Sequence, residues 1–305
     1  MSACTPSVNS NVMQQMVNNM RLSLIALPVF LSLGGCYGSS TYPTTLTLAV
    51  ADTPVDGAES VTLAFTGVQV QPAHGAVIEY DYPTTQLINL LQLQDDNYHL
   101  LLDDLEVPAG VYVSIRMLVD MNQSSITLSD GSVHPLVLQG TDQVGILVLH
   151  SFSLTDQEKA GFIVDFDLRK SISLVGGLYD FQPALRFIDG SNIGEIEGTV
   201  SSDLALGSMP VSDPACQPAA YIYSGNVTPT DINPTSNVQP VSTATVSLNN
   251  VTGEYFYESE YLSPGNYTVA ITCAAMDNPA TVDVLTFSAR QQASVVANEE
   301  TEVDF

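Results

Sequence analysis

The sequence is poor in basic residues and contains no tryptophan. Seven Lys and Arg stand against 33 Asp and Glu in 305 residues, which gives a formal net charge of -26 at pH 7. Nucleic-acid-binding proteins hold phosphate groups with clustered Lys and Arg, so this composition excludes a nucleic-acid partner. Tryptophan offers the largest stacking surface for a sugar ring. Without it, a carbohydrate site would have to rely on tyrosine.

Short motifs typical of enzymes are missing as well. The four histidines lie scattered at His74, His99, His134 and His150, without the paired spacing of zinc proteases. Neither a Gly-x-Ser-x-Gly elbow nor a phosphate-binding Gly-x-x-x-x-Gly-Lys loop occurs. Although a Ser, His and Asp could still converge in space, the sequence favours a protein that is not an enzyme, with calcium as the one cofactor to consider.

An apolar run at residues 22–33 follows Arg21 and leads into a Leu-Gly-Gly-Cys box that ends at Cys36. A basic residue, about 7 to 15 apolar residues and small residues at a cleavage site form a secretory signal, which is too short to span a bilayer. The order resembles the bacterial lipoprotein signal, whose cysteine receives a diacylglyceryl group and becomes the new N-terminus. We expect residues 1–35 to be a leader with signal peptide, Cys36 to carry lipid, and residues 36–43 to be a tether. An ordinary signal peptide or a buried helix with a chance cysteine is the alternative.

The start of the leader is open between Met1 and Met20, because residues 1–19 carry no charge whereas secretory n-regions are short and basic. Beside the anchor stands Tyr37 and not Asp. By resemblance to enterobacterial sorting, this favours the outer over the inner membrane. We therefore expect a lipid-anchored protein of the cell envelope, on the outer membrane of a Gram-negative bacterium, with periplasmic and surface orientations both open.

The four cysteines fit export. Cys4 lies in the leader and Cys36 takes the lipid, which leaves Cys216 and Cys273 in a compartment where disulfides persist. We predict that these two are bonded, with a chain-entropy contribution of about 4 kcal/mol. Two reduced, buried cysteines are the alternative.

Alternation of apolar and polar residues, the mark of half-buried strands, dominates the remaining chain. It is clearest at residues 44–51, 111–119 and 162–168. Further short runs lie at residues 60–70, 144–149, 184–188, 194–200, 219–223, 241–248, 267–273 and 301–305. Turn-forming residues separate the runs, so the sequence predicts an all-β fold of two β-sandwich domains, residues 44–189 and 193–305. Residues 86–102 fit either a short helix or a buried strand.

A short pattern occurs once in each half. Residues 108–112 (PAGVY) and 263–267 (SPGNY) both place a tyrosine two residues after a turn glycine, at the start of a strand. We interpret this as turn geometry shared by sandwich folds and not as a functional site.

Four segments resemble, in the same order, landmarks of the domain of unknown function 4382, which is found in exported bacterial and archaeal proteins. They are residues 48–65 (LAVADTPVDGAESVTLAF), 107–120 (VPAGVYVSIRMLVD), 164–172 (VDFDLRKSI) and 183–188 (PALRFI). The resemblance covers residues 44–189 and implies a fold and an exported location, but no activity. Residues 262–269 (LSPGNYTV) resemble transthyretin-like or carboxypeptidase regulatory-like sandwiches. The resemblance implies a transthyretin-like or Ig-like β-sandwich over residues 193–305.

Asp165 and Asp167 lie on one face of a predicted strand and could offer hard oxygen ligands to calcium. Arg169 and Lys170 stand close enough to neutralise them, and a solvated strand face is the alternative interpretation.

Tyrosines provide the second candidate site. Tyr221 and Tyr223 share one strand face, as do Tyr255 and Tyr257, and either pair could form a platform for a sugar ring. If these faces are the core instead, the platform does not exist.

Two functions follow from these candidates. The first is a non-catalytic, lipid-anchored envelope protein that serves as an interaction or structural module, with the membrane and a glycan or protein as partners. The alternative is a surface carbohydrate-binding or calcium-stabilised adhesion module.

Overall fold

The computed structural model describes residues 43–53, 57–93, 97–138, 145–206, 216–233, 235–273, 277 and 279–305. The predicted leader, Cys36 and the tether up to residue 42 lie outside them. The described residues form an all-β fold of sandwiched sheets, as the sequence predicts. None of the helices among them has the length and apolarity needed to cross a membrane.

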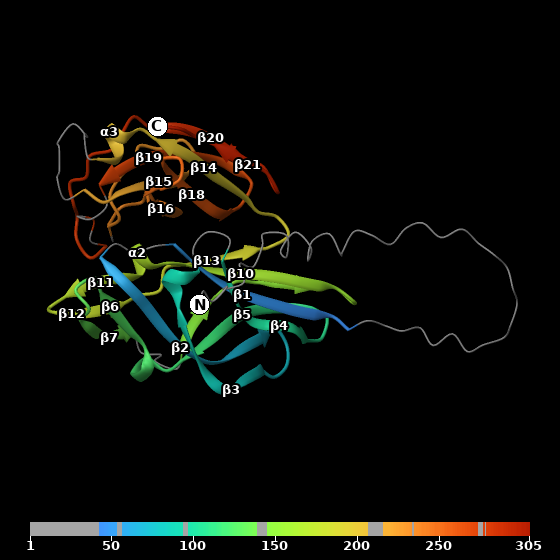
Figure 1. Ribbon diagram of the computed structural model, residues 1–305. Coiled ribbons are helices and arrows are strands. Elements are labelled where there is room, and N and C mark those ends of the chain that lie inside the picture. Colours follow the sequence, from blue (N-terminus) through green and yellow to red (C-terminus); the bar gives the residue numbers. More distant parts are fainter. Residues whose placement is uncertain are drawn as a thin grey trace, which may run out of the picture.

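The first half of the chain packs a four-stranded sheet against a nine-stranded sheet, around one apolar core (Figure 1). The four-stranded sheet has the order β13 (Leu185–Asp189), β10 (Lys159–Asp167), β1 (Thr45–Thr53) and β4 (His99–Glu106). The larger sheet has the order β11 (Ile172–Val175), β12 (Leu178–Phe181), β7 (Val133–Leu138), β6 (Ser125–Leu128), β2 (Ala58–Pro72), β5 (Gly110–Val119) and β8 (Gly145–Val148). In addition, β3 (Ile78–Asn89) pairs with β2, and β9 (Phe152–Leu154) pairs with β5.

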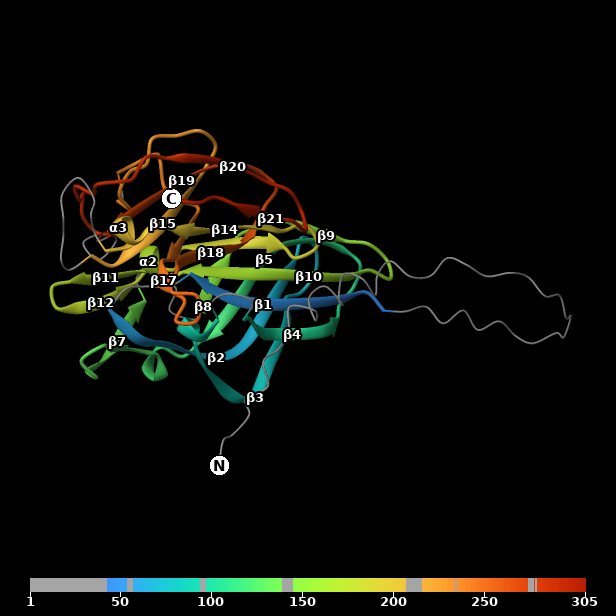
Figure 2. The same cartoon turned by 45° about the horizontal axis from the view of Figure 1, so that its top comes forward.

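The second half consists of two four-stranded sheets around a separate core. One has the order β17 (Ser247–Leu248), β18 (Tyr255–Leu262), β14 (Gly194–Val200) and β21 (Glu300–Glu302). The other has the order β16 (Ser242–Thr245), β15 (Pro218–Ser224), β19 (Gly265–Cys273) and β20 (Gln291–Val295). In both views the second half lies over the side of the first half that carries β1 and β10 (Figures 1 and 2).

Strand β1 is buried on both faces. Leu46, Leu48 and Val50 are fully buried in the core of the first half. Ala49 and Ala51, on the opposite face, join a small apolar cluster that also contains Tyr261 of the second half. Packing on both sides explains why residues 48–51 (LAVA) form a continuous apolar run within this strand.

Residues 86–102 form neither a single helix nor a single strand. β3 ends at Asn89, whose side chain accepts hydrogen bonds from the backbone N–H of Val61 and Leu91. That cap starts the 3-10 turn η1 (Leu90–Gln92), and β4 begins at His99. The other short turns are η2 (Met121–Gln123), α2 (Leu168–Ser171) and α3 (Ser202–Ala205).

The pattern repeated in the two halves has the same structural role in both. Tyr112 donates a hydrogen bond to the carbonyl of Pro108 at 2.6 Å, and Tyr267 donates one to the carbonyl of Ser263, also at 2.6 Å. In each case a buried ring fixes the turn that opens a strand, as tyrosine corners do in other sandwiches. The interpretation as shared turn geometry therefore fits the structure.

Candidate functional site

The Tyr221 and Tyr223 platform predicted from sequence does not exist, because both side chains are fully buried. The outer face of β15 is covered by loops that contribute Val227, Ile232 and Phe287 to a second small core. Both faces of this strand are therefore packed, since Ala220 and Ile222 on the other face belong to the main core. Neither the Tyr221 ring nor the Tyr223 ring is exposed for stacking on a sugar.

The second tyrosine pair is also part of the packing. Tyr257 is 1% exposed and donates a hydrogen bond to the carbonyl of Val303 at 2.7 Å. Tyr255 is half-buried and packs against the same core, whereas Phe256 is the residue of this strand segment that faces outward. The prediction of a tyrosine platform is thus wrong at both places, because aromatic side chains on these strands fill the interior.

Asp277 is a half-buried loop residue that contacts the outer face of β15. One of its carboxylate oxygens, Oδ2, accepts hydrogen bonds from the Tyr221 hydroxyl at 2.7 Å and from the Ile232 backbone N–H at 3.1 Å. Burial nevertheless raises the pKa of Asp277 to about 6, with smaller contributions in the same direction from Asp231 and Asp283. This carboxylate is therefore a titrating group near neutral pH, at a position that anchors a buried tyrosine.

Replacing Asp277 with asparagine should change how stability depends on pH. Because the pKa is higher in the folded protein than the ordinary value, the folded state binds the proton more tightly and loses stability as the pH rises. The free energy of unfolding of the wild type, minus that of D277N, should fall by about 1 kcal/mol between about pH 4 and pH 7, a value discounted for partial exposure. Urea denaturation across this range measures it, and parallel pH profiles of the two proteins would contradict it.

Asp165 and Asp167 are not a solvated face, since each side chain is only 2% exposed. Asp165 is the direct cross-strand partner of Arg186 on β13 and accepts from its Nε at 2.8 Å, with Nη2 at 2.7 Å. Asp167 accepts from the Lys170 backbone N–H at 3.0 Å and lies 2.8 Å from Lys170 Nζ. Two cationic side chains thus stand where a calcium ion would have to bind, which argues against these residues as calcium ligands.

Sequence reasoning identified Lys170 as a partner for this acidic pair but missed Arg186. Arg169, its other candidate, is 2% exposed and lies over the Tyr221 ring, 5.8 Å from the ring centroid. The signal for Arg186 was its place in the alternating run 184–188, which becomes informative only once β13 is known to pair with β10.

Among the described residues, one group of three carboxylates could hold a cation. Glu195 of β14 and Glu258 and Glu260 of β18 are half-buried and bring oxygen atoms within 4.8 Å of one another. Carboxylate oxygens are the ligands that calcium prefers. The sequence did not indicate this group, because Glu195 is more than sixty residues away from Glu258 and Glu260 along the chain.

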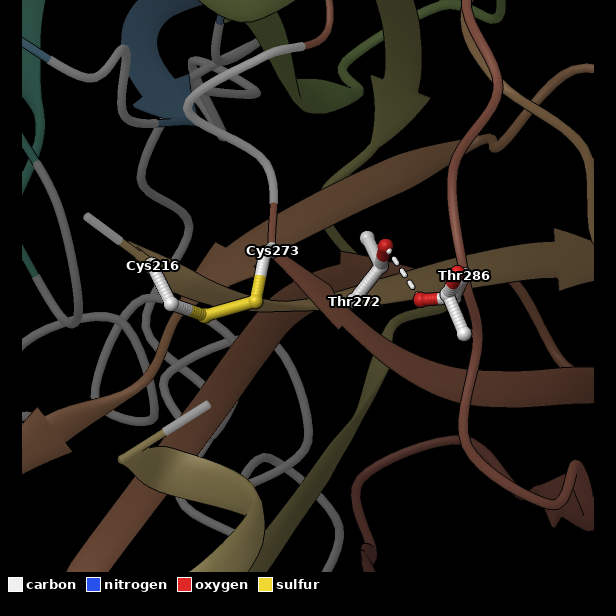
Figure 3. The surroundings of a disulfide bond; sticks show 4 residues. All are labelled: Cys216, Thr272, Cys273 and Thr286. Atoms are coloured by element: carbon white, nitrogen blue, oxygen red, sulfur yellow. Dashed lines mark hydrogen bonds between the residues drawn. A yellow bond between two sulfur atoms is a disulfide. The ribbon is translucent and has the colours of Figure 1, made fainter. Parts of the chain in front are cut away.

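The predicted disulfide between Cys216 and Cys273 is present. It joins the adjacent ends of β15 and β19, beside the pair Pro218 and Cys273 in the antiparallel register (Figure 3). Next to it, the buried Thr272 hydroxyl donates to the Thr286 carbonyl at 2.9 Å. The bond therefore closes the edge of the second core where a loop packs against β19.

A sequence-family model matches the segment that contains the strands β1 to β12. Residues 43–183 match the model of DUF4382, a domain of unknown function. This confirms the resemblance seen over most of residues 44–189. The DUF4382 segment includes Asp165 and Asp167 but ends before β13, the strand that carries Arg186 and completes the four-stranded sheet.

Comparison with other known proteins adds little beyond DUF4382. No curated protein matches the chain. Among solved structures it is similar to GBS52, the minor pilin of Streptococcus agalactiae, at 9% identity, 86% coverage of this chain, 94% of that chain and a TM-score of 0.20. The major pilin of Streptococcus pyogenes is 9% identical, with 86% coverage of this chain, 97% of that chain and a TM-score of 0.19. A DUF3823 family protein from Bacteroides uniformis is 10% identical, with 82% coverage of this chain, 98% of that chain and a TM-score of 0.17. TM-scores this low carry no argument about fold or function.

Proposed function

We propose that this chain is a non-catalytic protein of the cell envelope, held at the outer membrane by a lipid on Cys36 and serving as an interaction or structural module. The observation that carries the proposal is the order Arg21, the apolar run 22–33 and the small-residue box that ends at Cys36. A lipoprotein with two or three acyl chains stays on its membrane, whereas a single chain binds reversibly.

The packing of the folded part supports an interaction or structural module. The tyrosines and aspartates that the sequence offered as ligand groups are used inside the protein, in apolar cores or in buried ion pairs. With the Asp165 and Asp167 calcium site removed, the Glu195, Glu258 and Glu260 group is the candidate cation site left among the described residues. With the tyrosine platform removed, no observation favours the carbohydrate-binding alternative.

Replacing Cys36 with alanine should release the protein from the membrane fraction. The thioether requires the cysteine sulfur, so C36A should neither incorporate an alkyne-labelled fatty acid nor show the mass of an acylated N-terminus. The measurements are membrane fractionation of expressing cells, in-gel detection of the label and intact mass. Separation of inner and outer membranes by density then assigns the membrane.

A matched control is available in Cys4, which the proposal places in the discarded leader. C4A should remain acylated and membrane-bound like the wild type. Label retained on C36A, or wild-type protein recovered unacylated with residues 1–35 attached, would rule out the anchor.

A further inference from the structure

Three of the seven Lys and Arg residues meet at the junction between the two halves. Arg169, Lys170 and Arg186 belong to the first half, and each reaches a group of the second half. We call these three side chains the cationic junction. The second half contributes Arg290 as its one basic residue in sequence, so both halves are strongly acidic and repel each other at long range.

Arg186 binds a β-bulge of the second half. In the pairing of β14 with β18, Gly194 lies opposite Leu262 and Ile196 opposite Ser259, so two residues of β18 face one of β14. The extra residue gives Tyr261 a φ of 55°, a region that residues other than glycine rarely adopt. Arg186 Nη1 donates to the Tyr261 carbonyl at 3.1 Å and Nη2 to the Glu260 carbonyl at 3.3 Å.

The guanidinium is fixed from its own side as well. Asp165, almost fully buried, holds Nε and Nη2 at 2.8 and 2.7 Å. One planar group with five N–H donors can thus bind a carboxylate of one sandwich and two carbonyls of the other. An ammonium group could not span both sets of acceptors in the same way.

Lys170 repeats this arrangement on the turn α2, and Arg169 beside it contacts the second half through an aromatic ring. Lys170 Nζ pairs with Asp167 of the first half and donates to the Pro240 carbonyl of the second at 2.7 Å. The Arg169 guanidinium lies over the ring of Tyr221, a cation–π contact at 5.8 Å. The second half is therefore held by side chains from both α2 and β13.

The linker between the halves is short and is itself tied to both. The Gly190 N–H donates to the Gly161 carbonyl of the first half at 3.0 Å, and the Asn298 N–H of the second half donates to the Ile193 carbonyl at 2.6 Å. Around it, Ala49, Ala51 and Tyr261 belong to one apolar cluster. A short linker that is hydrogen-bonded to both halves restricts their reorientation.

We propose that the cationic junction latches the two sandwiches into one rigid body, so that the second half keeps a fixed orientation on the DUF4382 segment. Independent motion is the default for domains joined by a small polar interface. Here Arg186 donates to two carbonyls exposed by the bulge, Lys170 donates to a third carbonyl, and Arg169 lies over a buried ring. Buried carboxylates hold Arg186 and Lys170 in place, and packing holds Arg169. The latch does not depend on lipid at Cys36.

Distances between spin labels on the two halves test the latch in the whole protein in detergent. Val133 is 64% exposed in the first half and Val251 is 95% exposed in the second, so V133C and V251C can be labelled together. The wild-type background should give a single narrow distance distribution. Arg186→Lys, which keeps a cation beside Asp165, combined with K170M should broaden it at least about twofold as the halves become independent.

K159M and R290M are the matched controls. Lys159 pairs with Asp104 within the first half, and Arg290 donates to the Val227 carbonyl within the second. Both variants should keep the narrow distribution. Circular dichroism establishes that R186K and K170M are folded, and each is also tested singly in case the pair is not. A broad wild-type distribution, or an unchanged narrow one in every folded junction variant, would overturn the latch.

Discussion

Replacing Cys216 and Cys273 together with serine should lower the free energy of unfolding of the second half by about 4 kcal/mol. The bond spans 57 residues and encloses β15, β16, β17, β18 and β19, so it removes a large loop-closure entropy from the unfolded chain. Its loss is a large share of a typical net stability of 5 to 15 kcal/mol. Urea denaturation, followed by tyrosine fluorescence because the chain has no tryptophan, measures the change.

Reduction of the wild type provides the control for the serine variant. A reductant should move the wild-type midpoint to that of the double serine variant, and should leave the variant itself unchanged. A serine variant that unfolds at the wild-type urea concentration would show that the cross-link contributes nothing to stability.

Strands with one face buried were predictable from sequence, because period-two alternation follows directly from such a strand. Residues 111–119 and 162–168 show this alternation and correspond to β5 and β10, although Val111 and Val113 of β5 are exposed and residues 163–167 of β10 are buried on both faces. Strands whose side chains are mostly exposed carry no such pattern. β3 is the clearest example, since Ile88 is its single buried residue, and it was missed.

The candidate sites could not be predicted, because what decides them is remote in sequence. Whether Tyr221 is exposed depends on loops near residues 227–238 and 285–287, which cover β15 from outside. The environment of Asp165 depends on β13, a neighbour that only the folded topology supplies. In both cases the alternation shows correctly which residues share a face of the strand, but it does not show what packs against that face.

The disulfide, in contrast, could be predicted by counting the cysteines. Four cysteines, one in the leader and one in the lipid box, left a single pairing in an oxidising compartment. The repeated tyrosine pattern lies between these extremes. The sequence shows the spacing at Tyr112 and Tyr267, whereas the hydrogen bond from each tyrosine to its turn carbonyl depends on the fold.

Replacing Arg186 with methionine should destabilise the first half by about 3 to 5 kcal/mol, because it leaves the Asp165 carboxylate buried without its arginine. Burial already raises the pKa of Asp165, and the Arg186 guanidinium opposes that shift. Without the arginine the folded state should bind a proton more tightly still, so the loss should be largest at neutral pH and shrink as the pH falls. Urea denaturation at several pH values measures both effects.

The buried charge, and not the loss of a long side chain, should account for this result. R186M combined with D165N removes both charges and should recover part of the lost stability, as double-mutant cycles show for coupled pairs. K159M breaks an ion pair whose side chains are 60% and 53% exposed, and it should cost less than about 1 kcal/mol. If R186M destabilised the protein no more than K159M does, or if D165N gave no recovery, the Asp165 carboxylate would not depend on Arg186, and the β13 edge would owe its stability to packing alone.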